Sequence, residues 1–271
     1  MHKMDFLQPQ EKELSLSFIQ KGYIIQPTED RAALDRIQSQ IATLAATFLG
    51  KEPPQNPTDF LNNIANSIGI AQLNDLRLHV ISGLMETDWF RKAYFSCARS
   101  LLETLVGNEL VMQRNLGLSV QLPHDDSSLL PLHSDVWGSE CSPFEVVLWI
   151  PLVDCYRTKS MFVLPASLDR QWRDRMHEFA DKGTESLFEA IEPEVEWLKV
   201  PYGNVVVFTP TIMHGNRVNQ EATTRWTLNI RFKGVFTPYS DKRLGEYFSP
   251  ISVRPVSRIG MKFQLPGGFN E

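Results

Sequence analysis

The sequence is poor in the features that define several common protein classes. It has three cysteines in 271 residues and no Cys-x-x-Cys spacing, which argues against a disulfide framework and a thiolate zinc site. No cluster of lysine and arginine exceeds two residues and the formal net charge is −5, so we expect no nucleic-acid partner. The longest apolar runs, such as VVLWIPLV, are far shorter than a membrane span.

The N-terminal segment, MHKMDFLQPQEKELSLSF, lacks the continuous apolar stretch of a signal peptide. These absences predict a cytoplasmic protein that does not bind membranes. Hydrophobic residues make up 42% of the chain, which is enough for a substantial buried core. We therefore expect one folded domain over residues 1–271.

Hydrophobic periodicity divides this domain into regions. Residues 1–109 are predicted to be mainly helical support, and the clearest helix there takes Thr28 as its N-cap and ends at Gly50. Residues 110–240 contain runs typical of strands, interrupted by a helical insertion at about 167–196 and followed by a C-terminal extension, 241–271. The predicted strands are 115–122, 144–153, 160–165, 204–209 and 225–236. Helices followed by strands predict an α+β fold, an antiparallel β core braced by N-terminal helices.

Two His-x-Asp pairs stand close together in the stretch LPHDDSSLLPLHSDVWG. They are His124 with Asp126 and His133 with Asp135. Because strand side chains repeat every two residues, either pair at a strand end would project both side chains to one side. His214 directly follows the strand 204–209 and is a candidate third ligand. Two histidines and one carboxylate form a facial triad that leaves positions on Fe(II) open.

The strand 225–236 carries an unusual polar row. Its alternation places Arg225, Thr227, Asn229 and Arg231 on one face and apolar residues on the other. Arginines inside such a strand are costly unless they line a cavity that holds an anion. The planar guanidinium suits a carboxylate, which predicts an acidic ligand near Arg225.

The set His133-x-Asp135, His214 and Arg225 resembles the His-x-Asp…His-x10-Arg pattern of Fe(II)/2-oxoglutarate-dependent oxygenases. The surrounding segment, PLHSDVWGSECSPFEVVLWIPLVDCYRTKSMFVLPASL, resembles their phytanoyl-CoA dioxygenase-like branch, and within it the oxygenases of bacterial carbohydrate and aminoglycoside biosynthesis clusters. The resemblance covers roughly residues 110 to 240. It implies a double-stranded β-helix, a jelly-roll or cupin-like core. It also favours His133 and Asp135 over the first pair, since they lead into the next strand, while His124 and Asp126 lie in a polar loop at the mouth of the site.

The resemblance further implies the chemistry. His133, Asp135 and His214 would be the metal ligands and catalytic residues, and 2-oxoglutarate would chelate the iron while its far carboxylate pairs with Arg225, helped by Thr227. Dioxygen would be consumed, with succinate and CO2 as products and hydroxylation of a substrate C–H bond as the default outcome. The presence of Asp135 argues against halogenation. The partners are thus a small-molecule substrate, 2-oxoglutarate and dioxygen.

Further residues are predicted to shape the pocket. Gln121 is expected to bind the cosubstrate. A small polar metabolite, such as a sugar or a sugar-derived biosynthetic intermediate, is the expected substrate on the resemblance alone. Its candidate contacts are Trp137, Lys159, Asn216, Arg217, Asn229 and Arg231.

Two alternatives from other classes share the barrel. One is a cupin-like sugar isomerase or epimerase, which needs no 2-oxoglutarate; Arg225 with Thr227 argues against it. The other is a non-catalytic β-barrel ligand-binding protein that has kept a relic metal site.

Overall fold

The structure is a computed structural model that describes residues 6–138 and 140–264. Within these ranges the strands form two antiparallel sheets. The main sheet has seven strands in the order β1-β7-β4-β9-β2-β10, with β3 also paired to β9, and the small sheet has three in the order β6-β5-β8. The strands are β1 (Tyr23–Pro27), β2 (Leu110–Gln113), β3 (Gly117–Gln121), β4 (Glu145–Pro151), β5 (Phe162–Val163), β6 (Glu196–Trp197), β7 (Asn204–Phe208), β8 (His214–Gly215), β9 (Arg225–Gly234) and β10 (Phe248–Ser252).

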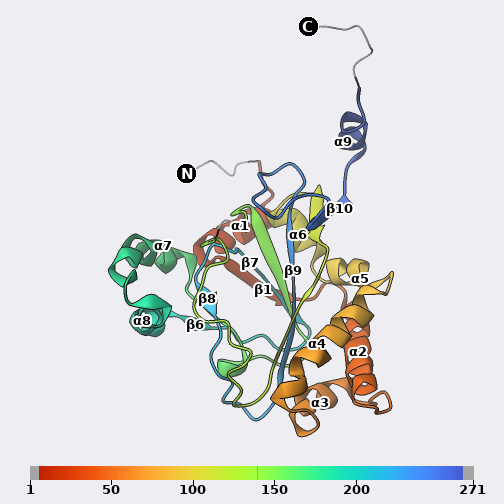
Figure 1. The fold of residues 1–271 in the computed structure, drawn as a ribbon. Coiled ribbons are helices and arrows are strands. Elements are labelled where there is room, and N and C mark those ends of the chain that lie inside the picture. The colour runs from red at the N-terminus through yellow and green to blue at the C-terminus, as the bar shows by residue number, and fades with distance from the viewer. Residues whose placement is uncertain (1–5, 139, 265–271) are drawn as a thin grey trace.

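Helices cover the main sheet and fill the connection between β5 and β6. In Figure 1, α2, α3, α4 and α5 gather on one side of β9, and α7 and α8 lie on the opposite side. The helices are α1 (Pro9–Lys21), α2 (Arg31–Phe48), α3 (Pro57–Asn62), α4 (Ile70–Met85), α5 (Phe90–Ser96), α6 (Arg99–Leu105), α7 (Ala166–Arg175), α8 (Gly183–Ile191) and α9 (Pro255–Gly260). The predicted mixed architecture, an antiparallel core with N-terminal helices, is confirmed at this level.

The long strand β9 divides the interior into two environments. Its apolar residues Trp226, Leu228, Ile230 and Phe232 are buried in the main core, against the N-terminal helices. Its opposite face, together with the alternate face of β4, points toward the small sheet. Because side chains alternate along β9, one of its faces joins the apolar core and the other lines a polar interior.

Several elements differ from the sequence-based prediction. The α2 N-cap is Asp30 rather than Thr28, because the Asp30 carboxylate accepts a hydrogen bond from the Ala33 backbone N–H at 2.9 Å. The Thr28 hydroxyl instead donates to the Cys97 carbonyl at 3.1 Å. The last helical segment before the β core is divided into α5 and α6, because Ala98 between them has a non-helical backbone.

The main sheet also extends beyond the predicted core at 110–240. β1 pairs with β7 and β10 pairs with β2, so strands from both flanking regions complete the sheet. The backbone groups of these short strands form hydrogen bonds with strands that are distant in the sequence, and such pairing cannot be predicted from local periodicity. The described part of the predicted extension 241–271 contains β10 and α9; residues 265–271, like residues 1–5, lie outside the described ranges.

Across residues 6–138 and 140–264, no helix combines the length and the apolar character needed to cross a membrane.

Candidate metal centre

Two histidines from distant parts of the chain face each other across a backbone bridge. The His133 N–H donates to the His214 carbonyl at 2.9 Å, and the His214 N–H donates to the His133 carbonyl at 2.8 Å. The bridge needs Gly215 next to His214, because a Cβ there would lie 2.8 Å from the Leu130 carbonyl oxygen. This isolated β-bridge therefore fixes the spacing of the two residues.

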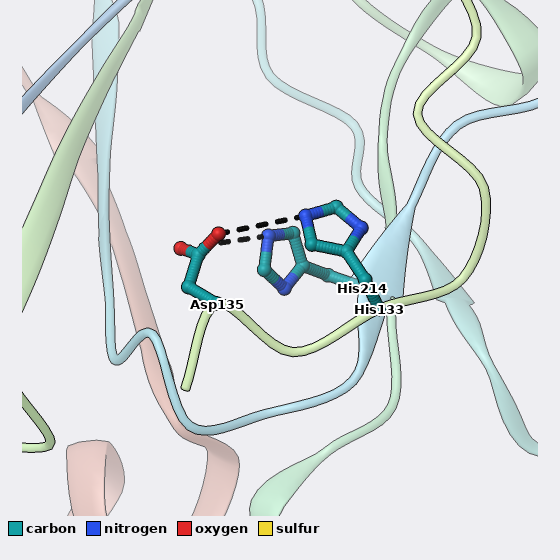
Figure 2. Close-up of side chains that lie close together, drawn as sticks. All are labelled: His133, Asp135 and His214. Carbon is teal, nitrogen blue, oxygen red and sulfur yellow. Dashed lines mark ion pairs between the residues drawn. The ribbon is translucent and has the colours of Figure 1, made fainter. Parts of the chain in front are cut away.

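Asp135 completes a cluster with these two histidines. Its Oδ1 lies 3.5 Å from His133 Nε2, and its Oδ2 lies 4.0 Å from His214 Nε2. Figure 2 shows the carboxylate facing both rings. The three potential ligand atoms all lie within 4.8 Å of one another. The predicted His-x-Asp and His residues thus converge on one point.

Both imidazoles are oriented by a hydrogen bond from Nδ1 to the backbone carbonyl two residues earlier in the chain. His133 Nδ1 lies 2.7 Å from the Pro131 carbonyl oxygen, and His214 Nδ1 lies 2.9 Å from the Ile212 carbonyl oxygen. A carbonyl only accepts, so each Nδ1 carries a proton and each Nε2 is left to face Asp135. Metal-binding histidines are commonly oriented in this way, with the ring nitrogen that does not face the metal donating to a carbonyl or carboxylate. The donor set, two imidazoles and a carboxylate, fits Fe(II).

Burial and charge set the protonation of the cluster. Burial lowers the pKa of His214 to about 4, so this imidazole is neutral near pH 7. Burial also opposes protonation of His133, but its interactions with the Asp135 carboxylate and the Pro131 carbonyl together raise the His133 pKa above its usual value. Burial raises the pKa of Asp135, yet His133, His214 and Arg231 together hold it well below its usual range. The carboxylate is therefore ionised at neutral pH.

A cavity of about 60 Å³ adjoins the cluster and extends to Arg225. His133 and His214 line one part of it, and Arg225 and Thr227 line another. Its apolar wall consists of Leu130, Trp149, Met161 and Phe208. The cavity therefore connects the His-Asp-His cluster to a buried cation.

Arg225 is a buried cation without an acidic partner in the described part of the chain. The residue is 3% exposed, and its guanidinium donates to the Ser160 carbonyl at 3.1 Å and to the Ser119 hydroxyl at 2.8 Å. Burial lowers the pKa of Arg225 to about 10. Its Nε and the Thr227 hydroxyl are buried with no hydrogen-bond partner. Such orphaned groups require an explanation, and a carboxylate at this end of the cavity satisfies both.

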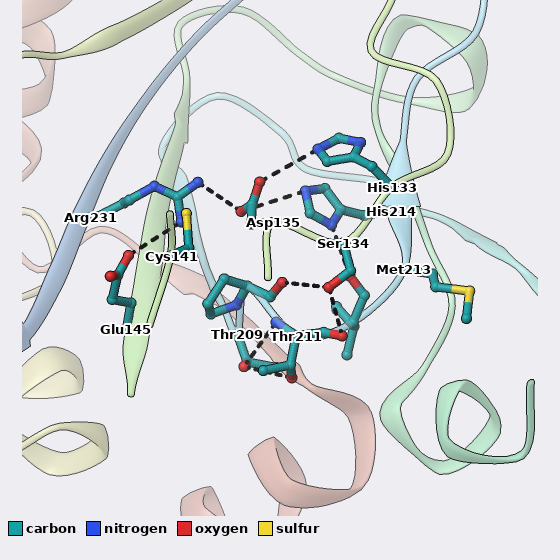
Figure 3. A network of polar contacts seen from close by, with 12 residues as sticks. His133, Ser134, Asp135, Cys141, Glu145, Thr209, Thr211, Met213, His214 and Arg231 are labelled. Atoms are coloured by element: carbon teal, nitrogen blue, oxygen red, sulfur yellow. Dashed lines mark hydrogen bonds and ion pairs between the residues drawn. The ribbon is translucent and has the colours of Figure 1, made fainter. Parts of the chain in front are cut away.

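Arg231 contacts Asp135 from the side opposite the histidines (Figure 3). Its Nη2 lies 2.8 Å from Asp135 Oδ2, and its Nη1 lies 3.5 Å from Glu145 Oε2. The sequence reading assigned Arg231 to the substrate. The structure instead pairs it with two acids.

The first His-x-Asp pair is placed in a separate, exposed loop. His124 and Asp126 are both exposed, and His124 has φ +59°. The buried residue of this loop is Asp125, whose carboxylate accepts hydrogen bonds from the Ser127 N–H at 2.8 Å and the Ser127 hydroxyl at 2.9 Å. The loop is thus built around Asp125, away from the three converging ligands.

The remaining predicted contacts fall into two groups. Asn216 and Asn229 line the cavity, and no hydrogen bond is assigned to the Asn229 side chain among the described residues. Lys159, in contrast, is buried and donates to Asn62 at 2.6 Å and Thr223 at 2.7 Å, outside the cavity lining. Arg217 forms an ion pair with Glu185 at 2.6 Å.

Two other predicted residues lie apart from the cavity lining. Gln121 donates from Nε2 to the Arg217 carbonyl at 2.7 Å, while its Oε1 is buried without a partner. Trp137 is 36% exposed and borders a groove against the α7–α8 connection.

Sequence reasoning missed Glu145 and the apolar wall. Glu145 opens β4 and is 2% exposed, and a charged residue at the start of an apolar strand was the available signal. Met161 and Phe208 read as ordinary core residues because nothing local separates a cavity wall from a core.

No protein-family model matches the chain, and a search of curated proteins gives no significant match. Solved structures do match. The non-heme alpha ketoglutarate dependent carbocyclase SnoK from nogalamycin biosynthesis superposes with a TM-score of 0.57 at 15% identity, covering 92% of this chain and 98% of SnoK. AviO1 from Streptomyces viridochromogenes Tue57 gives 0.54 at 17% identity over 86% and 99%. EctD from S. alaskensis gives 0.53 at 14% identity over 84% and 78%.

A further neighbour is the non-heme monooxygenase ThoJ, with a TM-score of 0.52 at 14% identity over 82% of this chain and 77% of ThoJ. At these identities the likeness shows a shared fold. The chain therefore has the fold of a group that includes non-heme, alpha-ketoglutarate-dependent enzymes. The resemblance drawn from the sequence is confirmed at the level of the fold.

Proposed function

We propose that this protein is a non-haem Fe(II)- and 2-oxoglutarate-dependent oxygenase. The observation that carries the proposal is Arg225, a buried cation with an unpaired Nε that shares a cavity with a His-Asp-His cluster. A sugar isomerase of similar fold would use the ligands but has no need of this cation. A metal ion accounts for the His-Asp-His cluster, and a dicarboxylate bound in the shared cavity accounts for the unpaired Arg225.

The three ligands would hold iron through His133 Nε2, His214 Nε2 and one oxygen of Asp135. Because His214 is neutral and Asp135 is ionised near pH 7, the set is ready to bind a cation without releasing protons from these two groups. The carbonyls of Pro131 and Ile212 keep the two rings in the required tautomer.

The far end of the cavity would hold the cosubstrate. Arg225 would bind the distal carboxylate of 2-oxoglutarate through its fork, and the Thr227 hydroxyl would donate to the same group. When bound, Fe(II) and 2-oxoglutarate supply the oxidising chemistry, in which dioxygen converts 2-oxoglutarate to succinate and CO2 and the substrate C–H bond is hydroxylated. Trp149, Met161 and Phe208 would keep bulk water from the cavity.

Finer parts of the proposal concern architecture and substrate. We propose that the two sheets are the two sides of a double-stranded β-helix within a single domain of a cytoplasmic protein. The proposed substrate is a small polar metabolite, such as a sugar-derived intermediate. The exposed ring of Trp137, two residues after Asp135, supports a stacking surface near the site, and the cavity amides of Asn216 and Asn229 offer polar contacts.

Anaerobic titration with Fe(II) and then 2-oxoglutarate tests the proposal. A weak visible charge-transfer band should develop only when both are present, because a bidentate keto acid then occupies open positions on the iron. His133→Ala should abolish the band, and Lys199→Ala, a surface substitution, should retain it. A wild-type protein that binds Fe(II) but never develops the band would overturn the proposal. Slow conversion of 2-oxoglutarate to succinate in air would add independent support.

A further inference from the structure

Arg231 is held in place by contacts of both its guanidinium and its backbone, in addition to its contact with Asp135. Its guanidinium also contacts Glu145, whose side chain is 0% exposed and accepts from the Ser142 N–H at 2.9 Å. The Arg231 backbone N–H donates to Gln113 Oε1 at 3.1 Å. Figure 3 shows this chain of contacts leading from Glu145 through Arg231 to the carboxylate.

The two oxygens of Asp135 have different nearest partners. Oδ2 lies 2.8 Å from Arg231 Nη2 and 4.0 Å from His214 Nε2, whereas Oδ1 lies 3.5 Å from His133 Nε2. A carboxylate can bind a metal through one oxygen or through both. An oxygen held by a charge-assisted hydrogen bond is a weaker metal ligand, and its lone pairs are directed to the guanidinium.

We propose that Arg231 is a positioning residue that confines Asp135 to coordination through one oxygen. The inference rests on the function proposed above. Two histidines and a one-oxygen carboxylate leave three positions of an octahedral ion open, and a chelating keto acid needs two of them. A carboxylate bound through both oxygens would occupy one of the three. Arg231 thereby protects the positions on which cosubstrate and dioxygen depend.

A purely charge-balancing role for Arg231 makes a different prediction. Removing a cation beside the site would then strengthen metal binding and leave binding of the cosubstrate to the metal-loaded protein unchanged. If Arg231 only held the ligand loop together, Arg231→Met should lose metal binding to the same extent as is expected for Asp135→Ala.

The test uses Arg231→Met, Arg231→Lys and the wild type, loaded with Mn(II). We expect Arg231→Met to keep Mn(II) affinity within about threefold or to raise it, and to weaken 2-oxoglutarate binding to the loaded protein by at least about tenfold. Water-proton relaxation should count about one fewer water on Mn(II) than in the wild type. Arg231→Lys, which restores one donor, should recover part of both effects.

Two results would overturn the inference: an unchanged water count with unchanged 2-oxoglutarate binding in Arg231→Met, or loss of Mn(II) binding to the extent seen in Asp135→Ala. Circular dichroism checks that the variants fold. If Arg231→Met does not fold, Glu145→Gln removes the charge behind Arg231 and should shift the same two measurements in the same direction by a smaller factor. Failure of the wild type itself to bind 2-oxoglutarate would contradict the proposed function rather than the role of Arg231.

Discussion

The two His-x-Asp pairs have the same spacing in the sequence but opposite environments in the fold. His133 is bridged to His214 through the backbone, and its partner Asp135 is held by Arg231. His124 stands exposed with a left-handed backbone, and Asp126 is exposed beside it. The comparison shows that spacing alone does not make a ligand pair. A distant strand must supply the third ligand and fix the angle of the first.

The largest expected effect separates the two pairs directly. His133→Ala or Asp135→Ala should weaken Fe(II) or Co(II) binding by more than about 100-fold, since losing a ligand costs more than losing a group that only hydrogen-bonds to a ligand. His124→Ala and Asp126→Ala should change it by less than about twofold. Isothermal titration under anaerobic conditions measures both. Equal losses in the two pairs would show that the assignment is wrong.

The second effect tests the other end of the cavity. Arg225→Met should weaken 2-oxoglutarate binding by roughly 10- to 150-fold, because one charge-assisted interaction of about 1.5–3 kcal/mol is lost. Metal binding should remain, since Arg225 does not contact the three ligands. Arg99→Met, a surface arginine paired with Glu103, is the matched control. Unchanged 2-oxoglutarate affinity in Arg225→Met would show that the cosubstrate does not bind at this end of the cavity.

A third prediction concerns pH and the metal-free protein. Burial lowers the pKa of His214 from its ordinary value of 6.5 to about 4. Between these values the unfolded chain takes up a proton that the folded chain does not, so the free energy of unfolding falls as the pH falls, by up to about 3 kcal/mol from this group. His133 contributes with the opposite sign, because its pKa is raised. Denaturant melts at pH 7 and pH 4.5 should therefore show a smaller loss in His214→Gln than in the wild type, while His124→Gln should match the wild type.

The smallest effect belongs to the loop pair. His124 adopts φ +59°, a region that costs an L-residue roughly 1–2 kcal/mol and glycine much less. His124→Gly should therefore leave the free energy of unfolding unchanged or raise it by up to about 1 kcal/mol, with metal binding intact. Thermal unfolding measures the change. A clear destabilisation would show that the imidazole has a structural role that its exposure does not suggest.

Part of the site could be predicted from the sequence because polar and apolar residues alternate regularly along β9. One apolar face and one polar face could be read from Arg225 to Phe232, and the structure buries the first and turns Arg225 and Thr227 into the cavity. This alternation depends on local periodicity, which a single sequence records well. The set His133, Asp135 and His214, in contrast, was predicted from the resemblance to a family pattern, and its three potential ligand atoms lie within 4.8 Å of one another.

Long-range contacts could not be predicted from the sequence. Arg231 and Lys159 were expected to face the substrate, but the partners that engage them, Glu145 for Arg231 and Asn62 for Lys159, come from distant segments. The strands β1 and β10 gain their pairing from β7 and β2 and have weak patterns of their own. Such pairings are decided by tertiary contacts, and no window of adjacent residues contains them.

The reciprocal backbone bridge between His133 and His214 has a consequence for how the protein acquires its metal. Where ligands lie on separate flexible loops, as in small zinc domains, binding the ion is the folding event itself. Here two of the three ligands are joined by two reciprocal backbone hydrogen bonds within the folded chain. We expect the chain to fold to completion first and to load its ion afterwards, so that apoprotein released by a chelator can be recharged without refolding.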